Sequence, residues 1–258
     1  MDKLIFNPKV AKNKPRDVSE RRNITTCPFC NTEELVDIMK IDGSKIWLMN
    51  KFRTLENTFQ TVVIESDKHD GDFSNYSDDE ANDIVEFAID AWQEMIDSKK
   101  YKSVAMFKNF GPYSGGSLHH PHLQIVGFDN IDCMKNIESF NFEGTNVVSE
   151  KGVSMNISDN PIMGFVELNI ILHDKAKMTT FSKWINNGIS YFINDYQNGR
   201  CNSYNLFFYQ NKNDIVAKIV PRYNDSPYFV GYKIPQVNCD QRVIELTKEL
   251  QNYINKKS

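Results

Sequence analysis

The most constraining feature of this sequence is that one predicted order of elements, strand–helix–strand–strand, occurs twice. The strands are rich in β-branched and aromatic residues, and the helices carry apolar residues at helical spacing. In the first half the elements are 58–65, 77–100, 103–109 and 124–128; in the second they are 164–172, 178–194, 204–209 and 215–220. A repeated unit predicts an α+β fold of two similar halves. We place the boundary after residue 135, giving domains 1–135 and 136–258.

The start of the first predicted helix is well defined. Ser77 and Glu80 have the spacing of a capping box, in which each side chain accepts a hydrogen bond from the other residue's backbone N–H. Acidic residues at 78–80 also favour the positive end of the helix dipole. A further strand is expected at 45–49, and a final amphipathic helix at about 241–254.

The composition excludes several classes of protein. Of the 258 residues, 40% are hydrophobic, which suffices for a packed core, and the net charge of −4 argues against nucleic-acid binding through overall charge. No apolar run approaches the length of a membrane span. The five cysteines do not form a disulfide framework. We therefore expect a cytoplasmic protein that binds neither nucleic acid nor membrane. One basic cluster is either a solvated arm or a phosphate-facing segment: Lys9, Lys12, Lys14, Arg16, Arg21 and Arg22.

Cys27 and Cys30 form a C-x-x-C pair, which is typical of a redox centre or of half a zinc site and also arises by chance. A redox pair normally opens a helix after a strand, whereas proline-containing irregular sequence precedes this one. A zinc site needs two further nitrogen or sulfur ligands. The chain has five histidines, and His69 follows a predicted strand in a polar loop from which it could reach a metal.

The sharpest chemical signal is the run from Gly115 to Gln124, which holds three of the five histidines. In extended backbone, alternate residues share a face, so His120, His122 and Gln124 lie together. A nucleophilic imidazole attacks through one nitrogen while the other donates a hydrogen bond, and a backbone carbonyl can accept it. Gln cannot take up a proton, so Gln124 would stabilise phosphoryl charge without activating water.

The residues ahead of these histidines suit a phosphate. Gly115 and Gly116 expose backbone N–H groups, and Ser117 adds a hydroxyl. If His120 binds a metal, His122 is held beside it and remains able to react. The sequence therefore predicts phosphoryl chemistry here, with a solvated or structural histidine cluster as the alternative.

Together these motifs resemble the galactose-1-phosphate uridylyltransferase family of the histidine-triad superfamily. The likeness rests on the order C-x-x-C, an isolated histidine, and Gly-x-Ser-x-x-His-Pro-His-x-Gln. It implies zinc bound by Cys27, Cys30, His69 and His120. It also implies that His122 is the nucleophile, that Gln124 steadies the phosphoryl group, and that Ser117 contacts the departing phosphate. The substrate contacts that it implies are Asn50, Asn109, Gly115, Gly116, Tyr232 and Lys233.

The resemblance further implies a half-barrel of antiparallel strands with flanking helices, built from two histidine-triad-like repeats. Members of the family are often homodimers. The implied reaction moves a nucleoside monophosphate from a nucleotide sugar or dinucleotide to a phosphate-bearing acceptor, through a covalent nucleotidyl-His122. A dinucleotide or ADP-sugar phosphorylase, a hydrolase and a non-catalytic nucleotide-binding module are the alternatives, ahead of a zinc-dependent nucleic-acid binder.

Two segments of the second half depart from the family pattern. Residues 217–222 contain no histidine where the family binds a second, structural metal, so we expect none. In 230–233, Lys233 stands where the family has a glutamate that contacts the hexose. An ammonium group suits a phosphate better than it suits sugar hydroxyls, and we expect Lys233 and Arg222 to offset phosphate charge.

Overall fold

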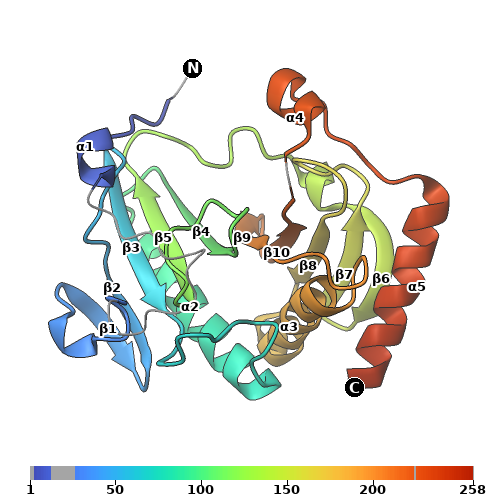
Figure 1. The fold of residues 1–258 in the computed structure, drawn as a ribbon, viewed down its shortest axis with the longest axis horizontal. Coiled ribbons are helices and arrows are strands. Elements are labelled where there is room, and N and C mark those ends of the chain that lie inside the picture. Colours follow the sequence, from blue (N-terminus) through green and yellow to red (C-terminus); the bar gives the residue numbers. More distant parts are fainter. Residues whose placement is uncertain (1–2, 13–26, 224, 258) are drawn as a thin grey trace. The chain divides into compact units, whose positions relative to one another are not determined.

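The computed structural model describes residues 3–12, 27–223 and 225–257 (Figure 1). It divides into two compact units. The first comprises Met1–Asp72 and Asp83–Lys135, and the second comprises Phe73–Asn82 and Asn136–Ser258. Within the described residues, no helix has both the length and the hydropathy that a membrane span requires. Of the basic cluster near the N-terminus, Lys14, Arg16, Arg21 and Arg22 lie outside the described residues.

The first unit contains five antiparallel strands in the order β1-β2-β3-β5-β4. Their bounds are β1 Ile38–Asp42, β2 Lys45–Met49, β3 Thr58–Ile64, β4 Ser103–Phe110 and β5 His122–Phe128. The strands predicted at 45–49, 58–65 and 103–109 are confirmed to within a residue, and β5 begins two residues earlier than predicted. A one-turn helix, α1 (Pro8–Ala11), lies near the N-terminus, and a 3₁₀ turn covers Thr32–Glu34.

Helix α2 (Asp78–Asp97) belongs to the first unit from Asp83 onward and contacts β3 and β4 through Met95 and Trp92. The predicted capping box is present: the Glu80 N–H donates to Ser77 Oγ (3.2 Å), and the Ser77 N–H donates to Glu80 Oε2 (3.1 Å). Trp92, which is buried, donates from Nε1 to the carbonyl of Val104 in β4 (3.0 Å). This contact joins the apolar face of the helix to the strand that follows it in the chain.

The second unit also contains five antiparallel strands. They are β6 Gly144–Glu150, β7 Val153–Ser158, β8 Leu168–Leu172, β9 Tyr204–Asn211 and β10 Asp214–Pro221, in the order β6-β7-β8-β10-β9. The helices are α3 Met178–Asn194, α4 Pro227–Tyr232 and α5 Asp240–Lys257, with 3₁₀ turns at Ser139–Phe142 and Lys175–Lys177. Helix α3 packs against β7, β8 and β10, and α5 packs against β6 and α3.

The strand order is therefore the same in the two units. In each, the third strand leads through a long helix to the fourth, and the fifth strand pairs between the third and the fourth. The expected mixture of antiparallel strands and flanking helices is confirmed.

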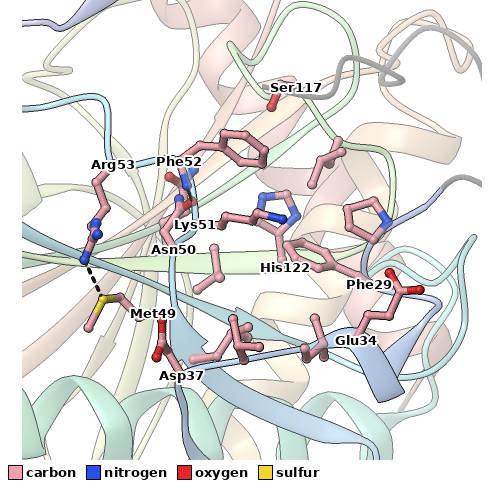
Figure 2. Close-up of a pocket in the computed structure, with 17 residues that line it drawn as sticks. Phe29, Glu34, Asp37, Met49, Asn50, Lys51, Phe52, Arg53, Ser117 and His122 are labelled. Atoms are coloured by element: carbon pink, nitrogen blue, oxygen red, sulfur yellow. Dashed lines mark hydrogen bonds between the residues drawn. The ribbon is translucent and has the colours of Figure 1, made fainter. Parts of the chain in front are cut away.

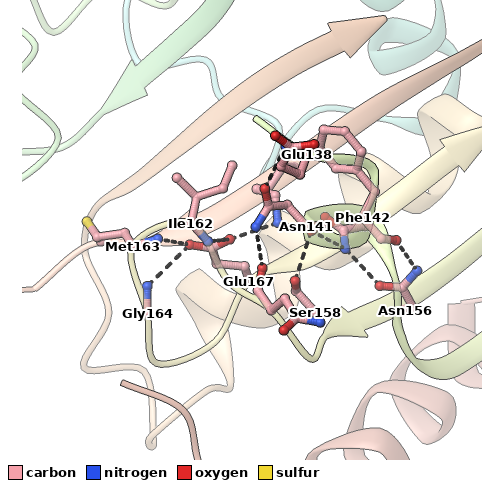
Figure 3. A network of polar contacts seen from close by, with 12 residues as sticks. Glu138, Asn141, Phe142, Asn156, Ser158, Ile162, Met163, Gly164 and Glu167 are labelled. Atoms are coloured by element: carbon pink, nitrogen blue, oxygen red, sulfur yellow. Dashed lines mark hydrogen bonds and ion pairs between the residues drawn. The ribbon is translucent and has the colours of Figure 1, made fainter. Parts of the chain in front are cut away.

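The strand predicted at 164–172 begins only at Leu168. Gly164 and Phe165 have φ values of +134° and +61°, which an extended strand does not contain. The N–H groups of Ile162, Met163 and Gly164 instead turn toward the Glu167 side chain (Figure 3). The Phe165 N–H donates to the carbonyl of Gln236. The apolar residues Phe165 and Val166 gave the strand pattern, but the chain here forms a loop around the buried carboxylate.

Glu167 is the centre of a buried polar network. Its carboxylate accepts hydrogen bonds from the backbone N–H groups of Ile162 (2.9 Å) and Met163 (2.8 Å) (Figure 3). Lys218 of β10 donates from Nζ to Glu167 (2.8 Å) and to the carbonyl of Asn141 (3.0 Å). Both charged side chains are fully buried, so each compensates the desolvation of the other.

Candidate functional site

The four predicted zinc ligands lie together in the first unit. The ligand atoms of Cys27, Cys30, His69 and His120 are all within 4.8 Å of one another. Cys30 Sγ is 3.2 Å from His69 Nδ1 and 3.4 Å from His120 Nδ1, and Cys27 Sγ is 3.7 Å from His120 Nδ1. A tetrahedral zinc ion with ordinary bond lengths separates sulfur and nitrogen ligands by about 3.6 Å. Two thiolates and two imidazoles at these distances fit Zn²⁺.

Three chain segments bring these ligands together. The cysteines lie in a tight turn in which the Cys30 N–H donates to the Cys27 carbonyl (3.2 Å). His69 comes from the loop that follows β3, and both ends of this loop are held by Lys108. The Lys108 ammonium is 2.5 Å from Glu65 Oε1 and 3.6 Å from Asp72 Oδ1, and all three side chains are buried. The loop is therefore anchored independently of a metal.

The protonation of His120 suits metal binding. Its Nε2 is 2.9 Å from the carbonyl oxygen of Ser66, which can only accept, so Nε2 carries the proton and the Nδ1 lone pair faces the sulfurs. Burial lowers the pKa of His120 to about 4. The imidazole is therefore neutral at pH 7, and neutral imidazole is the form that binds metals.

His122, the first residue of β5, is held in one tautomer. Its Nδ1 is 2.8 Å from the carbonyl oxygen of His120, so Nδ1 donates and the lone pair is on Nε2. This is the kind of backbone carbonyl partner that the sequence predicts for a nucleophile. His119, the third histidine of the run, is not part of the cavity wall that contains His122. Its Nε2 is instead 2.7 Å from Asp70 Oδ1.

A cavity of about 240 Å³ in the first unit has His122 in its wall (Figure 2). Of the predicted site residues, Asn50, Ser117 and Gln124 line it together with His122. Its apolar surface includes Phe29, Leu35, Leu48 and Val62, and its charged side chains are Glu34, Asp37, Lys51 and Arg53. An apolar cavity with a few converging polar groups is typical of a small-molecule site.

Other predicted contacts do not line this cavity. Asn109 lies near the end of β4 against Gly116, where an added Cβ would be 3.2 Å from the Asn109 Cβ. Gly115 has φ = +84°, as a tight turn requires. The Gly116 N–H donates to Ser114 Oγ (3.2 Å). We expected this N–H to face a phosphate, but its hydrogen bond lies within the loop itself.

The remaining predicted contacts belong to the second unit. Tyr232 ends α4 with 76% of its surface exposed, and Lys233 follows it with φ = +56°. The Arg222 guanidinium is engaged within the second unit, because it is 2.6 Å from Asp225 Oδ1 and donates to Asn205 Oδ1 (2.9 Å). Its expected role toward phosphate finds no support in these contacts.

Several cavity residues were not predicted from the sequence. Lys51 and Arg53 follow the predicted contact Asn50 in the sequence, and Phe29 lies inside the C-x-x-C turn. The sequence could have indicated Lys51 and Arg53, since charged residues in an irregular segment next to a predicted substrate contact are themselves candidates for substrate binding. Glu34 and Asp37 gave no pattern, because their place in the cavity wall depends on how the chain turns before β1.

The comparisons with known proteins agree with this fold. The N-terminal and C-terminal models of a domain of unknown function, DUF4931, match residues 6–131 and 134–254. A DUF4931 family protein from Bacillus cereus is 41% identical, with 84% of this chain and 99% of that chain covered and a TM-score of 0.77.

More distant structures share the fold at low identity. An ADP-glucose phosphorylase from Arabidopsis thaliana with bound ADP-glucose is 14% identical over 96% of this chain and 94% of that chain, with a TM-score of 0.70. A uridylyltransferase is 12% identical over 90% and 92% of the two chains, with a TM-score of 0.69.

One curated protein shares a short stretch. A di-/tripeptide transporter of Lactobacillus helveticus is 36% identical over 52 residues, which is 20% of this chain and 10% of the transporter. The match spans only a tenth of the transporter, whereas the two DUF4931 models together cover nearly all of this chain. The chain belongs to the DUF4931 family.

Proposed function

We propose that this protein is a nucleotidyltransferase that moves a nucleoside monophosphate between phosphate groups through a covalent nucleotidyl-His122. The observation that carries the proposal is the His122 imidazole, which is fixed by the His120 carbonyl in the wall of a cavity of about 240 Å³. The fold shared with an ADP-glucose phosphorylase and a uridylyltransferase supports it.

The chemistry follows from the tautomer. The Nε2 lone pair of His122 attacks the α-phosphorus of a nucleoside diphosphate compound, a P–N bond forms, and the P–O bond to the departing phosphate breaks. The imidazole then carries a positive charge, and its Nδ1–H stays hydrogen-bonded to the His120 carbonyl. An oxygen of the acceptor phosphate attacks the same phosphorus, the P–N bond breaks, and His122 returns to its neutral form.

Neighbouring side chains have supporting roles. Gln124 would donate to the phosphoryl oxygens, and Ser117 would contact the departing phosphate. Asn50 would bind the nucleotide from the segment after β2. Because an amide cannot take up a proton, water is not activated at Gln124, and transfer is favoured over hydrolysis.

The metal and the substrates belong to the same proposal. Cys27, Cys30, His69 and His120 would hold zinc, which would fix the chain around His122 without touching the reacting phosphorus. The donor would be a nucleotide sugar or a dinucleotide, and the acceptor a sugar phosphate or inorganic phosphate. The two units would be histidine-triad-like repeats, for which the common strand order is support.

The test is the mass of the intact protein after brief incubation with a donor. UDP-glucose, UDP-galactose, ADP-glucose and diadenosine tetraphosphate would be supplied separately at mildly basic pH, because phosphoramidates are labile in acid. We expect the protein to gain one nucleotidyl group, whose mass identifies the base. His122→Gln should abolish the gain, and the neighbouring His119→Gln should retain it.

Three other results would point to a different function or a different nucleophile. An adduct that persists in His122→Gln would place the nucleophile elsewhere and end the proposal. Binding of a nucleotide without any adduct would identify a non-catalytic module. Release of nucleoside monophosphate into water without an acceptor would identify a hydrolase.

A further inference from the structure

We infer that Phe29 is a positioning residue for His122, and that the turn carrying two metal ligands holds Phe29 in place. The inference rests on the proposed function, because it gives a residue outside the nucleophile's own strand a part in aligning the attacking nitrogen. Phe29 is the third residue of the turn that begins at Cys27 and ends at Cys30.

The geometry joins one ring to both histidines. The Phe29 ring centroid is 5.4 Å from that of His122 with an interplanar angle of 70°, and 5.9 Å from that of His120 with an angle of 86°. Both are edge-to-face contacts, the arrangement that aromatic rings prefer. One side chain thus touches a predicted metal ligand and the predicted nucleophile.

The Phe29 ring also packs against the sheet of the first unit. Phe29 packs against an apolar cluster of the first unit made of Ile46, Leu48, Val62 and Ile64. These residues belong to β2 and β3, so the ring is held by the sheet as well as by the turn. A ring with both supports has little freedom to leave the imidazole that it contacts.

The orientation of the His122 ring matters for the proposed reaction. The hydrogen bond from Nδ1 to the His120 carbonyl fixes the tautomer but does not by itself set the rotation of the imidazole about the N–H···O direction. Attack on phosphorus requires the Nε2 lone pair to point along the line of the bond that breaks. The edge-to-face contact with the Phe29 ring limits this rotation. Phe29 lines the cavity, so its contact acts where the substrate arrives.

The experiment compares Phe29→Ala and Phe29→Leu with a matched control, Phe59→Ala. Phe59, in β3, stacks on Tyr101 with ring centroids 5.7 Å apart, and it is not one of the described residues that line the cavity. Three quantities are measured on each full-length protein: the metal content, the NMR order parameter of the His122 ring without substrate, which is the signature of its mobility, and the rate constant of adduct formation at saturating donor.

We expect Phe29→Ala to keep its metal, to lower the order parameter of the His122 ring, and to form adduct about tenfold more slowly. Phe29→Leu should fall between it and the parent protein. Phe59→Ala should change neither this signature nor the rate constant.

An unchanged signature and rate constant in Phe29→Ala would overturn the inference. If that variant loses metal, Phe29→Leu decides by the same two readouts, with unchanged values again overturning it. If the parent protein forms no adduct with any donor, the proposed function fails, and the NMR signature still decides whether Phe29 orients His122.

Discussion

Lys51 and Arg53 bring positive charge to the cavity that contains His122. Neither side chain forms an ion pair within the described residues, and the polar contact of Arg53 there is with Met49 Sδ (2.7 Å). A phosphoryl group in transfer carries negative charge, and a cation fixed beside it stabilises the transition state. We expected this charge from Arg222 and Lys233, but the cavity's own lining supplies it.

The first prediction concerns Lys51. Lys51→Met should slow adduct formation on His122 by about tenfold to a hundredfold, because the ammonium that offsets phosphoryl charge is lost. Lys51→Arg should restore most of the rate. The measurement is single-turnover mass spectrometry at saturating donor, with Lys248→Met, an exposed residue of α5, as the control. Equal rates in Lys51→Met and the parent would exclude this role.

At the scale of elements, the metal cluster joins a turn, a loop and the start of a strand. Cys30 contacts both histidines of the cluster, so its loss removes the sulfur at the centre of the ligand set. Cys239 is exposed and lies in the second unit, outside the cluster.

The second prediction is that Cys30→Ser lowers the bound zinc from about one ion per chain to a small fraction, and lowers the thermal midpoint of the first unit's unfolding. The reason is that metal binding contributes to folding free energy. Elemental analysis and calorimetry would measure both quantities, and a chelator should have the same effect on the parent protein. Cys239→Ser should match the parent. Full zinc content in Cys30→Ser would contradict the assignment.

The buried pair of Glu167 and Lys218 leads to the third prediction. Lys218→Met should reduce the free energy of unfolding by about 3–5 kcal/mol, because a buried carboxylate loses its partner. The double variant Glu167→Gln, Lys218→Met should recover much of the loss, since no charge is left unpaired. Urea unfolding followed by circular dichroism would measure both. A double variant as unstable as the single one would show that the charge is not the cause.

Most elements were predictable because their patterns are local. The helix at 178–194 matches α3 residue for residue, and the strands at 204–209 and 215–220 lie within β9 and β10. β6 and β7 were missed because they contain many polar residues: Val147 is the one buried residue of β6, and β7 buries Asn156 and Ser158 next to its apolar side chains. Their pairing depends on neighbours that a linear pattern does not contain.

The site was predictable where motif and backbone period agree. The spacing of His120, His122 and Gln124 placed His122 and Gln124 in the wall of one cavity, and C-x-x-C found the sulfurs. Lys51 and Phe29 were missed because their roles come from packing across strands. The domain boundary at 135 and the zinc identity stay predictions.

At the scale of the whole molecule, the two units share a strand order, but their fifth strands carry different side chains. β5 of the first unit contains His122 and Gln124, which line the cavity, whereas β10 of the second unit, Asp214–Pro221, contains no histidine. The nucleophilic histidine that we propose in β5 therefore has no counterpart in β10.

The fourth prediction is that residues 73–82 stabilise the second unit. Residues Phe73–Asn82 belong to the second unit, where Ser190 Oγ donates to the Ser74 carbonyl (3.3 Å) and Asn186 Nδ2 to the Tyr76 carbonyl (3.2 Å). A fragment of residues 136–258 should therefore unfold at a lower temperature than the same fragment with a peptide of residues 73–82 added. Calorimetry would measure the midpoints. Identical midpoints, with and without the peptide, would refute it, and a scrambled peptide is the control.

The two-residue spacing between His122 and Gln124 in β5 has a consequence for how this protein can change over generations. Two residues of a strand advance about 6.6 Å and return the side chain to the same face of the sheet. One residue inserted or deleted at Leu123 would therefore turn one of the two side chains to the opposite face, away from the cavity that both line. Descendants of this chain can exchange side chains along the strand, but none can alter its length there and keep both residues in the cavity wall.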